Sequence, residues 1–491
     1  MTLPAPASGA TIQARMALAG LVLLALALFA AASLSLEGLG FPLDDAWIHQ
    51  TYARSLAQGS GWSFAGEPSN GSTSPLWTAL LVPGHWLNLF PAIWAGLLGA
   101  ILLLAVGFFV QSELARQAGG AAWLSWLGSG FVALEWHLVW AALSGMETLA
   151  AGLLALVFAL VLWRRRQIGW WSGALVGIGV WLRPDLLTLL GPALWVGALG
   201  PGNWRQRVLA GARFGLGLVA VLGPYLAFQW ALAGQPWPST FYAKQAEYAQ
   251  LLAAPLTDRW LGLWPPLLAG GLTALTPGIA YWAYRLLRSR RWSDLAPLLW
   301  VGGYALLFAL RLPVAYQHGR YLHPLLPLLL TIGVLGWAEI VRGGQAGRLG
   351  WVLRRAWSLT IAAVLLVFGW LGARAYAIDV AIIETEMVRT AKWIAANTEP
   401  SALIAAHDIG ALGFYGDRPI LDLAGLVSPE VIPILRDQAA LADLLEQRQA
   451  DYLMTFPGWY PELTQGRAPV YQADVAYSPA AGGENMWVFA W

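Results

Sequence analysis

Two adjacent aspartates, Asp44 and Asp45, follow directly after the first long apolar segment of the chain. Like charges held this close to a low-dielectric region tend to raise the pKa of one of them, which would suit a general base. The alternative is a structural role, because Asp is favoured at the N-cap and in the first turn of the helix that the sequence predicts over 45–57. The residue types alone leave both roles open.

Glu147 and Arg183 are further charged groups beside apolar segments. Glu147 follows Ser144 by three residues, just before an apolar run, and this spacing predicts a capping box at a helix start. Arg183 and Asp185 flank a proline at a predicted outer helix break, where an ion pair is the simplest explanation for two charges near the membrane. Arg183 is also a candidate to contact a bound substrate.

Few basic groups are available to bind a phosphate. Arg320, with His318 and His323 beside it, lies at the predicted outer end of an apolar segment, and Lys244 follows Tyr242 in another outer loop. Arginine binds phosphate bidentately and lysine binds it as a point charge, so Arg320 is the first candidate. The structural alternative is an interfacial arginine that reaches lipid headgroups. The two histidines are five residues apart, which favours hydrogen bonding over a metal pair.

The composition places these groups in a membrane protein. Of the 491 residues, 58% are hydrophobic and 11% are charged, and 30 are tryptophan, a residue that favours the boundary between membrane and water. The net charge is +2, and no basic run is interleaved with aromatic residues, so a nucleic-acid partner is not expected. The absence of cysteine excludes disulfides and thiolate metal sites.

Eleven stretches are candidate transmembrane helices, for which about 20 mainly apolar residues are needed. They are 16–36, 92–111, 121–141, 147–163, 168–182, 186–200, 214–232, 261–285, 294–311, 321–340 and 356–378. Arginines gather in alternate loops, as the positive-inside rule requires of cytoplasmic loops. They are Arg15, Arg116, Arg164, Arg165, Arg166, Arg205, Arg207, Arg213, Arg285, Arg288, Arg290, Arg291, Arg342, Arg348, Arg354 and Arg355. The alternation predicts a cytoplasmic N-terminus.

This count requires that 75–90 lies beside the membrane as an interfacial or re-entrant helix. The first apolar segment is expected to be an uncleaved anchor. The outward parts are then the loops 37–91 and 233–260 and everything after about 379, which gives a membrane domain over 1–378 and an extracytoplasmic domain over 379–491.

The C-terminal domain has the mixed pattern of a small α/β module. We expect helices at 384–396 and 436–448 and strands at 402–406, 420–423, 452–456 and 486–491. Asp408 follows the first of these strands and reads first as a turn or a helix cap, with acceptor binding as an alternative.

Segments through nearly the whole chain resemble the GT-C glycosyltransferases, and most closely the group that includes the mycobacterial terminal arabinofuranosyltransferases. They are Asp44-Asp45, Tyr52-Ala53-Arg54, Gly61–Phe64, Ser74–Trp77, Leu143–Thr148, Leu182–Asp185, Pro238–Lys244, Gly319–Pro324 and Asp408–Gly410 with Asp422–Leu426. The resemblance implies a mainly α, polytopic membrane bundle of the GT-C type with a polyprenyl-phosphate or diphosphate sugar as donor. It implies transfer with inversion, a base or metal-ligand role for Asp44 or Asp45, and a catalytic role for Glu147. A divalent metal near the aspartate pair is left open.

The sequence therefore predicts a glycosyltransferase of the bacterial plasma membrane, whose acceptor is a glycan, lipid or protein of the cell envelope. Arg320, His318, Lys244 and Tyr242 are expected to hold the donor phosphate, and Arg183, His323 and Asp408 to contact substrate. A membrane transporter and a non-catalytic envelope scaffold are the alternatives. A transporter should place its charges at mid-bilayer in paired broken helices, whereas here they gather at the outer ends of spans.

Overall fold

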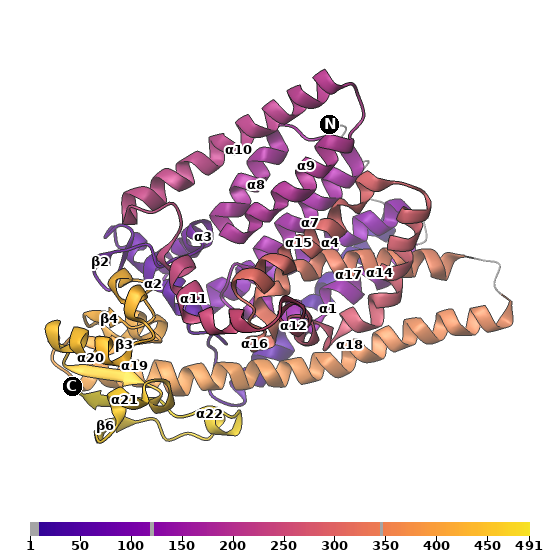
Figure 1. Ribbon diagram of the computed structural model, residues 1–491. Helices are drawn as coiled ribbons and strands as arrows, with labels where there is room; N and C mark the ends of the chain where they lie inside the picture. Colours follow the sequence, from indigo (N-terminus) through magenta and orange to yellow (C-terminus); the bar gives the residue numbers. More distant parts are fainter. Residues whose placement is uncertain (1–8, 118–121, 344–346) are drawn as a thin grey trace.

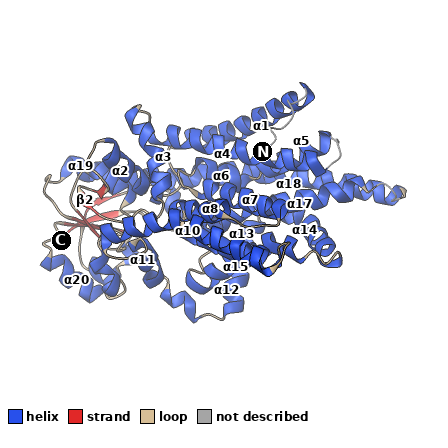
Figure 2. Cartoon of the chain, turned by 90° about the horizontal axis from the view of Figure 1, so that it is seen from above, coloured by secondary structure: helices blue, strands red, loops and turns tan. Residues whose placement is uncertain are grey.

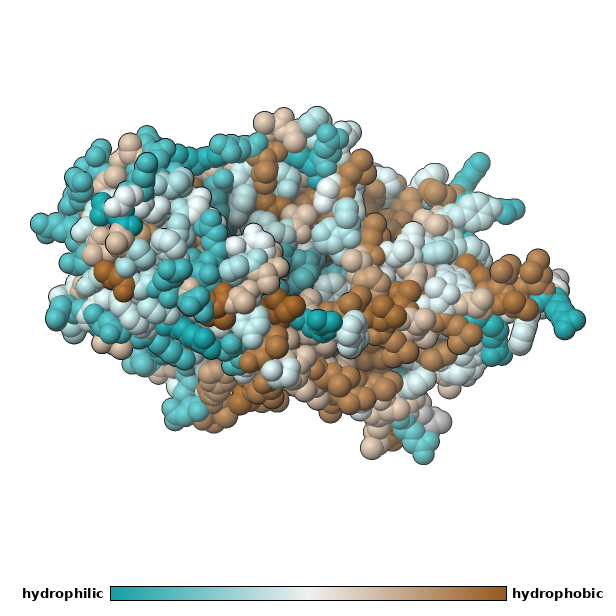
Figure 3. All heavy atoms as spheres, turned by 90° about the horizontal axis from the view of Figure 1, so that it is seen from below, coloured by the Kyte–Doolittle hydropathy of each residue, from teal (hydrophilic) through white to brown (hydrophobic). Residues whose placement is uncertain are grey.

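The computed structural model describes residues 9–117, 122–343 and 347–491 as a long helical bundle with a small sheet domain at one end (Figures 1 and 2). Seven segments are long and apolar enough to cross a membrane: Ile12–Leu34, Pro91–Gln117, Thr148–Arg165, Trp204–Ala233, Trp292–Arg311, Tyr316–Arg342 and Arg348–Asn397. On the face that Figure 3 shows, most of the hydrophobic residues lie over the helical bundle and hydrophilic residues dominate the sheet end. The predicted mainly α membrane bundle with a small C-terminal sheet domain is therefore confirmed.

The main helices of the bundle correspond in order to the eleven predicted stretches. They are α1 (Gly9–Leu34), α4 (Pro91–Gln117), α5 (Ala122–Ala133) with α6 (Trp136–Leu143), α7 (Thr148–Arg165), α8 (Trp170–Leu182), α9 (Leu190–Leu199), α10 (Trp204–Ala233), α14 (Gly271–Arg288), α15 (Ala296–Arg311), α17 (Leu326–Arg342) and α18 (Arg348–Ile382). Three of the stretches correspond to shorter or interrupted helices, α5 with α6, α8 and α9, and α14 is as long as α7 but is not apolar enough. Among the described residues, seven of the eleven stretches therefore meet the length and composition of a full span.

The break between α5 and α6 shows how a polar residue is tolerated at this depth. The Glu135 carboxylate accepts the backbone N–H of His137 at 2.9 Å and pairs with its ring Nδ1 at 2.8 Å. The other ring nitrogen contacts the carbonyl of Pro266 at 3.0 Å. The freed backbone and both side chains thus find partners, as the membrane interior requires. His137 is a satisfied interhelical histidine.

Small residues allow the closest helix pairs to pack. Gly278 of α14 lies against the backbone of Gly333 and Gly336 on α17, and Gly173 of α8 lies against the backbone of α10 near Phe214. A Cβ at any of these glycines would meet main-chain atoms. Between membrane helices, where the lipid is as apolar as the side chains, such close backbone approach provides much of the packing energy.

Short elements of two loops lie at the sheet end of the bundle. The first loop contains α2 (Asp45–Ala57), the hairpin β1 (Ser63–Phe64) with β2 (Glu67–Pro68), and α3 (Pro75–Trp86). With 12 residues, α3 is about 18 Å long and too short to cross a bilayer core of about 30 Å. The second loop contains α11 (Ser239–Glu247), α12 (Leu256–Gly262) and α13 (Pro265–Leu268).

The C-terminal domain contains a five-stranded mixed sheet with the order β4-β3-β5-β7-β6. Its strands are β3 (Ile404–Ala406), β4 (Ile420–Asp422), β5 (Tyr452–Thr455), β6 (Pro469–Gln472) and β7 (Trp487–Ala490). β3 pairs in parallel with β4 and β5, and β7 pairs antiparallel with β5 and β6. The helices α19 (Arg389–Asn397) and α20 (Gln438–Gln447) match the predicted ones, whereas β6 was not predicted.

One helical rod joins the two parts of the chain. α18 continues through a π-helical segment at 383–388 into α19, so the helix runs unbroken from the bundle into the sheet domain (Figure 1). The predicted boundary near 379 lies inside this rod.

Candidate active site

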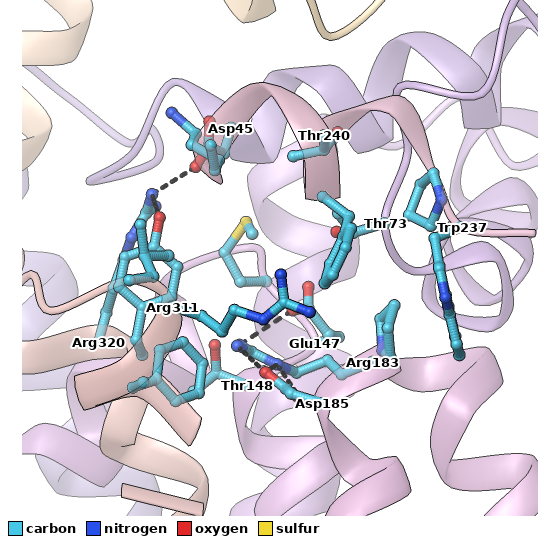
Figure 4. A pocket seen from close by; sticks show the side chains of 18 of the residues that line it. Asp45, Thr73, Glu147, Thr148, Arg183, Asp185, Trp237, Thr240, Arg311 and Arg320 are labelled. Carbon is cyan, nitrogen blue, oxygen red and sulfur yellow. Dashed lines mark hydrogen bonds and ion pairs between the residues drawn. The ribbon is translucent and has the colours of Figure 1, made fainter. Parts of the chain in front are cut away.

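A cavity of about 550 Å³ lies where the two loops meet the ends of the membrane helices. Its walls come from α2, from the segments around Glu147 and Arg183, from α11, from the end of α15 and from the segment around Arg320. Asp45 and Arg320 lie on one side, and Glu147, Arg183 and Asp185 form a second charged group (Figure 4). Segments more than 250 residues apart in the sequence therefore meet around one space, as the contact between Asp45 and Arg320 shows with its separation of 275 residues.

The two aspartates face different neighbours. Asp45, the first residue of α2, lines the cavity and accepts a hydrogen bond from Arg320 Nη2 at 2.6 Å. Asp44 precedes it and turns toward the C-terminal domain, where its oxygens accept the backbone N–H groups of Gly410 at 2.6 Å and Ala411 at 2.8 Å. Consecutive residues at a helix start point in different directions, which is why neighbours in sequence separate so fully. Asp45 therefore faces the cavity, and Asp44 attaches the two domains to each other.

The surroundings of Asp44 and Asp45 shift the pKa values of these two carboxyls in opposite directions. Burial favours the neutral form of Asp45, but Arg320 and Lys244 outweigh it and lower the pKa of this carboxyl. Burial and the nearby Asp408 raise the pKa of Asp44 to about 8, against the opposing effect of its two amide donors. Of the two, Asp45 is the group held ionised at neutral pH.

Arg320 is the cation best placed for a phosphate. It is buried, with its Nη2 on Asp45 and, at 3.3 Å, on the hydroxyl of Tyr321. Its Nε and Nη1 are buried and have no hydrogen-bond partner among the described residues. An unpaired buried donor costs about 1–3 kcal/mol, and more when it is charged, so these nitrogens favour an acceptor from outside the chain.

Lys244 of α11 is the second basic group near Asp45. Its ammonium contacts Glu247 at 2.9 Å, and Glu247 lies 3.7 Å from His407 of the C-terminal domain. Although burial opposes ionisation of Lys244, Tyr321, Glu247 and Asp45 raise the pKa of its ammonium above the usual range. Lys244 therefore stays charged in the cavity wall.

Arg183 is held by two acids. It forms an ion pair with Asp185 at 2.7 Å, as predicted, and contacts Glu147 at 3.3 Å. Glu147 is buried beside His49, which is 3.5 Å away, and it precedes α7 without accepting a capping hydrogen bond. The predicted capping box with Ser144 is absent, because the Glu147 side chain turns toward Arg183 and His49. Arg183 is thus largely neutralised within the cavity.

Four other predicted site residues do not line the cavity. His318 contacts Asp379 at 2.8 Å, and His323 is buried with its Nε2 on the carbonyl of His318. Tyr242 lies beside Phe241, which does line the cavity. Asp408 lies in the C-terminal domain near Asp44, and its buried Oδ2 has no hydrogen-bond partner within the described ranges. The structure gives the two histidines hydrogen-bonding partners within the chain.

Arg311 lines the cavity but was not predicted from the sequence. It ends α15, donates to Gln245 at 2.6 Å, and lies over the ring of Phe241 at 5.2 Å. No carboxylate among the described residues pairs with it. An arginine at the end of an apolar span looks like a lipid-facing anchor in the sequence, and only the position of α11 reveals its place in the wall.

The acids present do not form an evident metal site. Among the described residues, no group of three or more histidine or acidic side chains is arranged to hold an ion. Asp44 is occupied by two amides and Asp45 by Arg320. Both carboxylates of the pair thus already have partners within the chain.

Comparison with known proteins agrees with this architecture. Residues 377–489 match a family model described as a domain of unknown function, DUF8728. No curated protein matches the chain by sequence. Among solved structures, ArnT from Cupriavidus metallidurans bound to undecaprenyl phosphate is similar over 96% of this chain and 97% of its own, with 16% identity and a TM-score of 0.55.

A second similar structure is the oligosaccharyltransferase from Archaeoglobus fulgidus tethered to an acceptor peptide. The similarity covers 89% of this chain and 69% of that one, with 12% identity and a TM-score of 0.52. Both are GT-C glycosyltransferases. At this level of identity the likeness concerns the fold, and it confirms the expected GT-C architecture. The chain has the GT-C fold.

Proposed function

We propose that this protein is a membrane glycosyltransferase that moves a sugar from a polyprenyl-phosphate donor to an envelope acceptor, on the side of the membrane that holds the sheet domain. The observation that carries this proposal is the bonding of Arg320. Arg320 lines the cavity; one nitrogen of its guanidinium holds Asp45, while two others are buried and have no partner in the described part of the chain. A single rigid group can therefore bind a leaving phosphate and position a base.

The reaction follows from these positions. Asp45 accepts the proton of the acceptor hydroxyl as the hydroxyl oxygen attacks the anomeric carbon of the donor. The bond from that carbon to the phosphate oxygen breaks, and its electron pair leaves with the phosphate. Attack from the face opposite the phosphate inverts the anomeric centre. The proton on Asp45 then passes to solvent or to the departing phosphate.

The cations of the cavity match the charge that develops. As the donor bond breaks, negative charge grows on the phosphate, which Arg320, Lys244 and Arg311 stabilise because they already face the cavity. Arg183 is held by Asp185 and Glu147, so it suits hydroxyl groups of the sugar better than a second phosphate charge. The apolar residues Trp237, Phe241 and Phe308 line the same space and can contact the first isoprene units of the donor.

Membrane glycosyl transfer is also supported by the fold. ArnT, with undecaprenyl phosphate bound in its crystal structure, has the same overall architecture. The sugar is left open here between a pentose such as arabinofuranose, as the resemblance in the sequence suggests, and a hexose. The arginine-rich loops at the other end of the bundle support an extracytoplasmic position for this cavity, by the positive-inside rule.

The test is a turnover assay with purified protein and a panel of polyprenyl-phosphate sugars. The proposal expects release of polyprenyl phosphate from at least one donor, with loss of release in Asp45→Asn and in Arg320→Gln. Asp258→Asn in α12 is the matched control, because Asp258 lies outside the cavity. Uncoupled movement of a lipid or solute across a vesicle membrane, without any cleavage of donor, would favour the transporter instead.

A further inference from the structure

A second cavity lies at the opposite end of the helical bundle. It has a volume of about 520 Å³ and is lined by five arginines from the ends of α4, α7 and α14 and the segments that follow them: Arg116, Arg164, Arg166, Arg285 and Arg291. The reaction proposed above uses none of these residues. We name this space the arginine cavity.

Positive charge exceeds negative charge around the arginine cavity. Glu113 accepts from both Arg116 and Arg164, and Glu339 accepts from Arg285. Asp294 is fully buried behind the wall and pairs with Arg166 at 2.9 Å and with Arg291 at 2.8 Å. Five guanidiniums thus share three carboxylates, which leaves an excess of two positive charges among these eight residues.

These arginines retain capacity to bind an anion. Their side chains are between a third and a half exposed, and each guanidinium carries five N–H donors, of which the ion pairs use one or two. Planar forks of this kind match the oxygens of a phosphate. The chemistry of the cavity therefore favours a phosphate group.

Two helices run from this cavity to the cavity around Asp45, and their lengths give the approximate distance between the two cavities. α7 begins beside Glu147 and ends at Arg165; with 18 residues it is about 27 Å long. α15 ends at Arg311 and begins two residues after Asp294; with 16 residues it is about 24 Å long. Since the hydrocarbon core is about 30 Å thick, the two cavities lie near opposite membrane surfaces.

Two tryptophans line the arginine cavity, and exposed apolar residues lie close to its arginines in the sequence. Trp163 and Trp282 line it, with ring centroids 6.0 Å apart, and tryptophan is typical of the headgroup level. Trp170 and Leu287 lie nearby in the sequence and are 66% and 49% exposed. A ligand with a phosphate and acyl chains can bind the arginines through its phosphate and contact the aromatic and apolar residues through its chains.

We propose that the arginine cavity binds the headgroup of an anionic phospholipid from the leaflet opposite the donor. A basic pocket between membrane helices attracts such headgroups, which the leaflet presents at high local concentration. A phosphodiester with a net charge of −1 reduces the excess positive charge without removing the existing ion pairs. This binding site is independent of the proposed reaction.

The experiment measures binding of phosphatidylglycerol and phosphatidylcholine to the full chain by native mass spectrometry. The test variant is Arg116→Gln combined with Arg291→Gln. It removes two cations while Glu113 keeps Arg164 and Asp294 keeps Arg166, so no buried carboxylate is left unpaired. Affinity for phosphatidylglycerol should fall about fivefold for each arginine and about 30-fold for the pair.

The control is Arg205→Gln combined with Arg213→Gln on α10, which makes the same change in charge outside the cavity. It should bind phosphatidylglycerol like the unmodified protein. Equal retention of the lipid by both double variants would overturn the proposal, as would equal binding of the two lipids by the unmodified protein. Protection from thermal unfolding by inorganic phosphate but not by phosphatidylglycerol would instead indicate a soluble anion. If the test variant does not fold, Arg116→Gln alone gives the fivefold comparison.

Discussion

Replacing each aspartate of the acidic pair by asparagine separates chemistry from domain attachment. Asp45→Asn removes the proposed base, and loss of a positioned general base slows a reaction about 10²- to 10⁴-fold. The amide oxygen can still accept from Arg320 Nη2, but the charge assistance of the 2.6 Å contact is lost. With one partner a third exposed we take this loss as about 1 kcal/mol, so donor binding should tighten about fivefold.

Asp44→Asn should have the opposite profile. The amide keeps one oxygen for Ala411 but turns an N–H₂ group toward the N–H of Gly410, so one of two backbone contacts is lost. This should destabilise the attachment of the C-terminal domain by about 2 kcal/mol and lower turnover less than tenfold in protein that remains folded.

The assay combines three measurements on both variants: donor turnover, affinity for a polyprenyl phosphate, and thermal unfolding. We expect Asp45→Asn to bind tightly, turn over poorly and unfold normally, and Asp44→Asn to unfold early. The reasoning fails if Asp45→Asn keeps more than about a tenth of the turnover while folded Asp44→Asn loses it. That result would make Asp44 the base.

Three further predictions test other parts of the structure. Arg320→Lys keeps the charge but loses the two unpartnered nitrogens, so the KM for donor should rise about 10- to 100-fold in steady-state kinetics, with Tyr321→Phe as a milder control. Gly410→Ala would place a Cβ against the main chain of Asp44 and should destabilise the attachment by about 1–3 kcal/mol in thermal unfolding; Gly369→Ala, in open space on α18, should not. Burial raises the pKa of Asp422 from 3.8 to about 6, so the stability present below pH ~4 should fall by about 3 kcal/mol as the pH rises through 6. Asp422→Asn should flatten the dependence of unfolding temperature on pH, and an unchanged slope would refute this assignment.

Much of the fold could be predicted because hydrophobic length is a strong local signal. The helix over 45–57, the short segment after Ser74 and most strands of the C-terminal domain appear where the sequence places them. The weakest point was the number of full spans, because helices such as α8 and α14 satisfy the apolar pattern without the length or composition. The edge strand β6 was missed, since Pro469 begins it and a short edge strand carries little alternation.

The candidate site was predictable in residue type more than in geometry. The types and loop positions of Asp45, Lys244 and Arg320 sufficed to propose a base and two phosphate ligands that the structure brings to one cavity. The sequence could not distinguish Asp45 from Asp44, because the amides that bind Asp44 come from a distant domain. Arg311 was missed for the same reason: its role depends on tertiary packing against α11.

The contact between Asp44 and Gly410 can form only late in biosynthesis. Its two partners are separated by 366 residues, which a ribosome adding about 5–20 residues per second needs roughly 20–70 s to produce. Through that interval the first loop lacks its contact with the C-terminal domain. In a nascent chain, Asp44 therefore lacks its two amide partners until the C-terminal domain has been made.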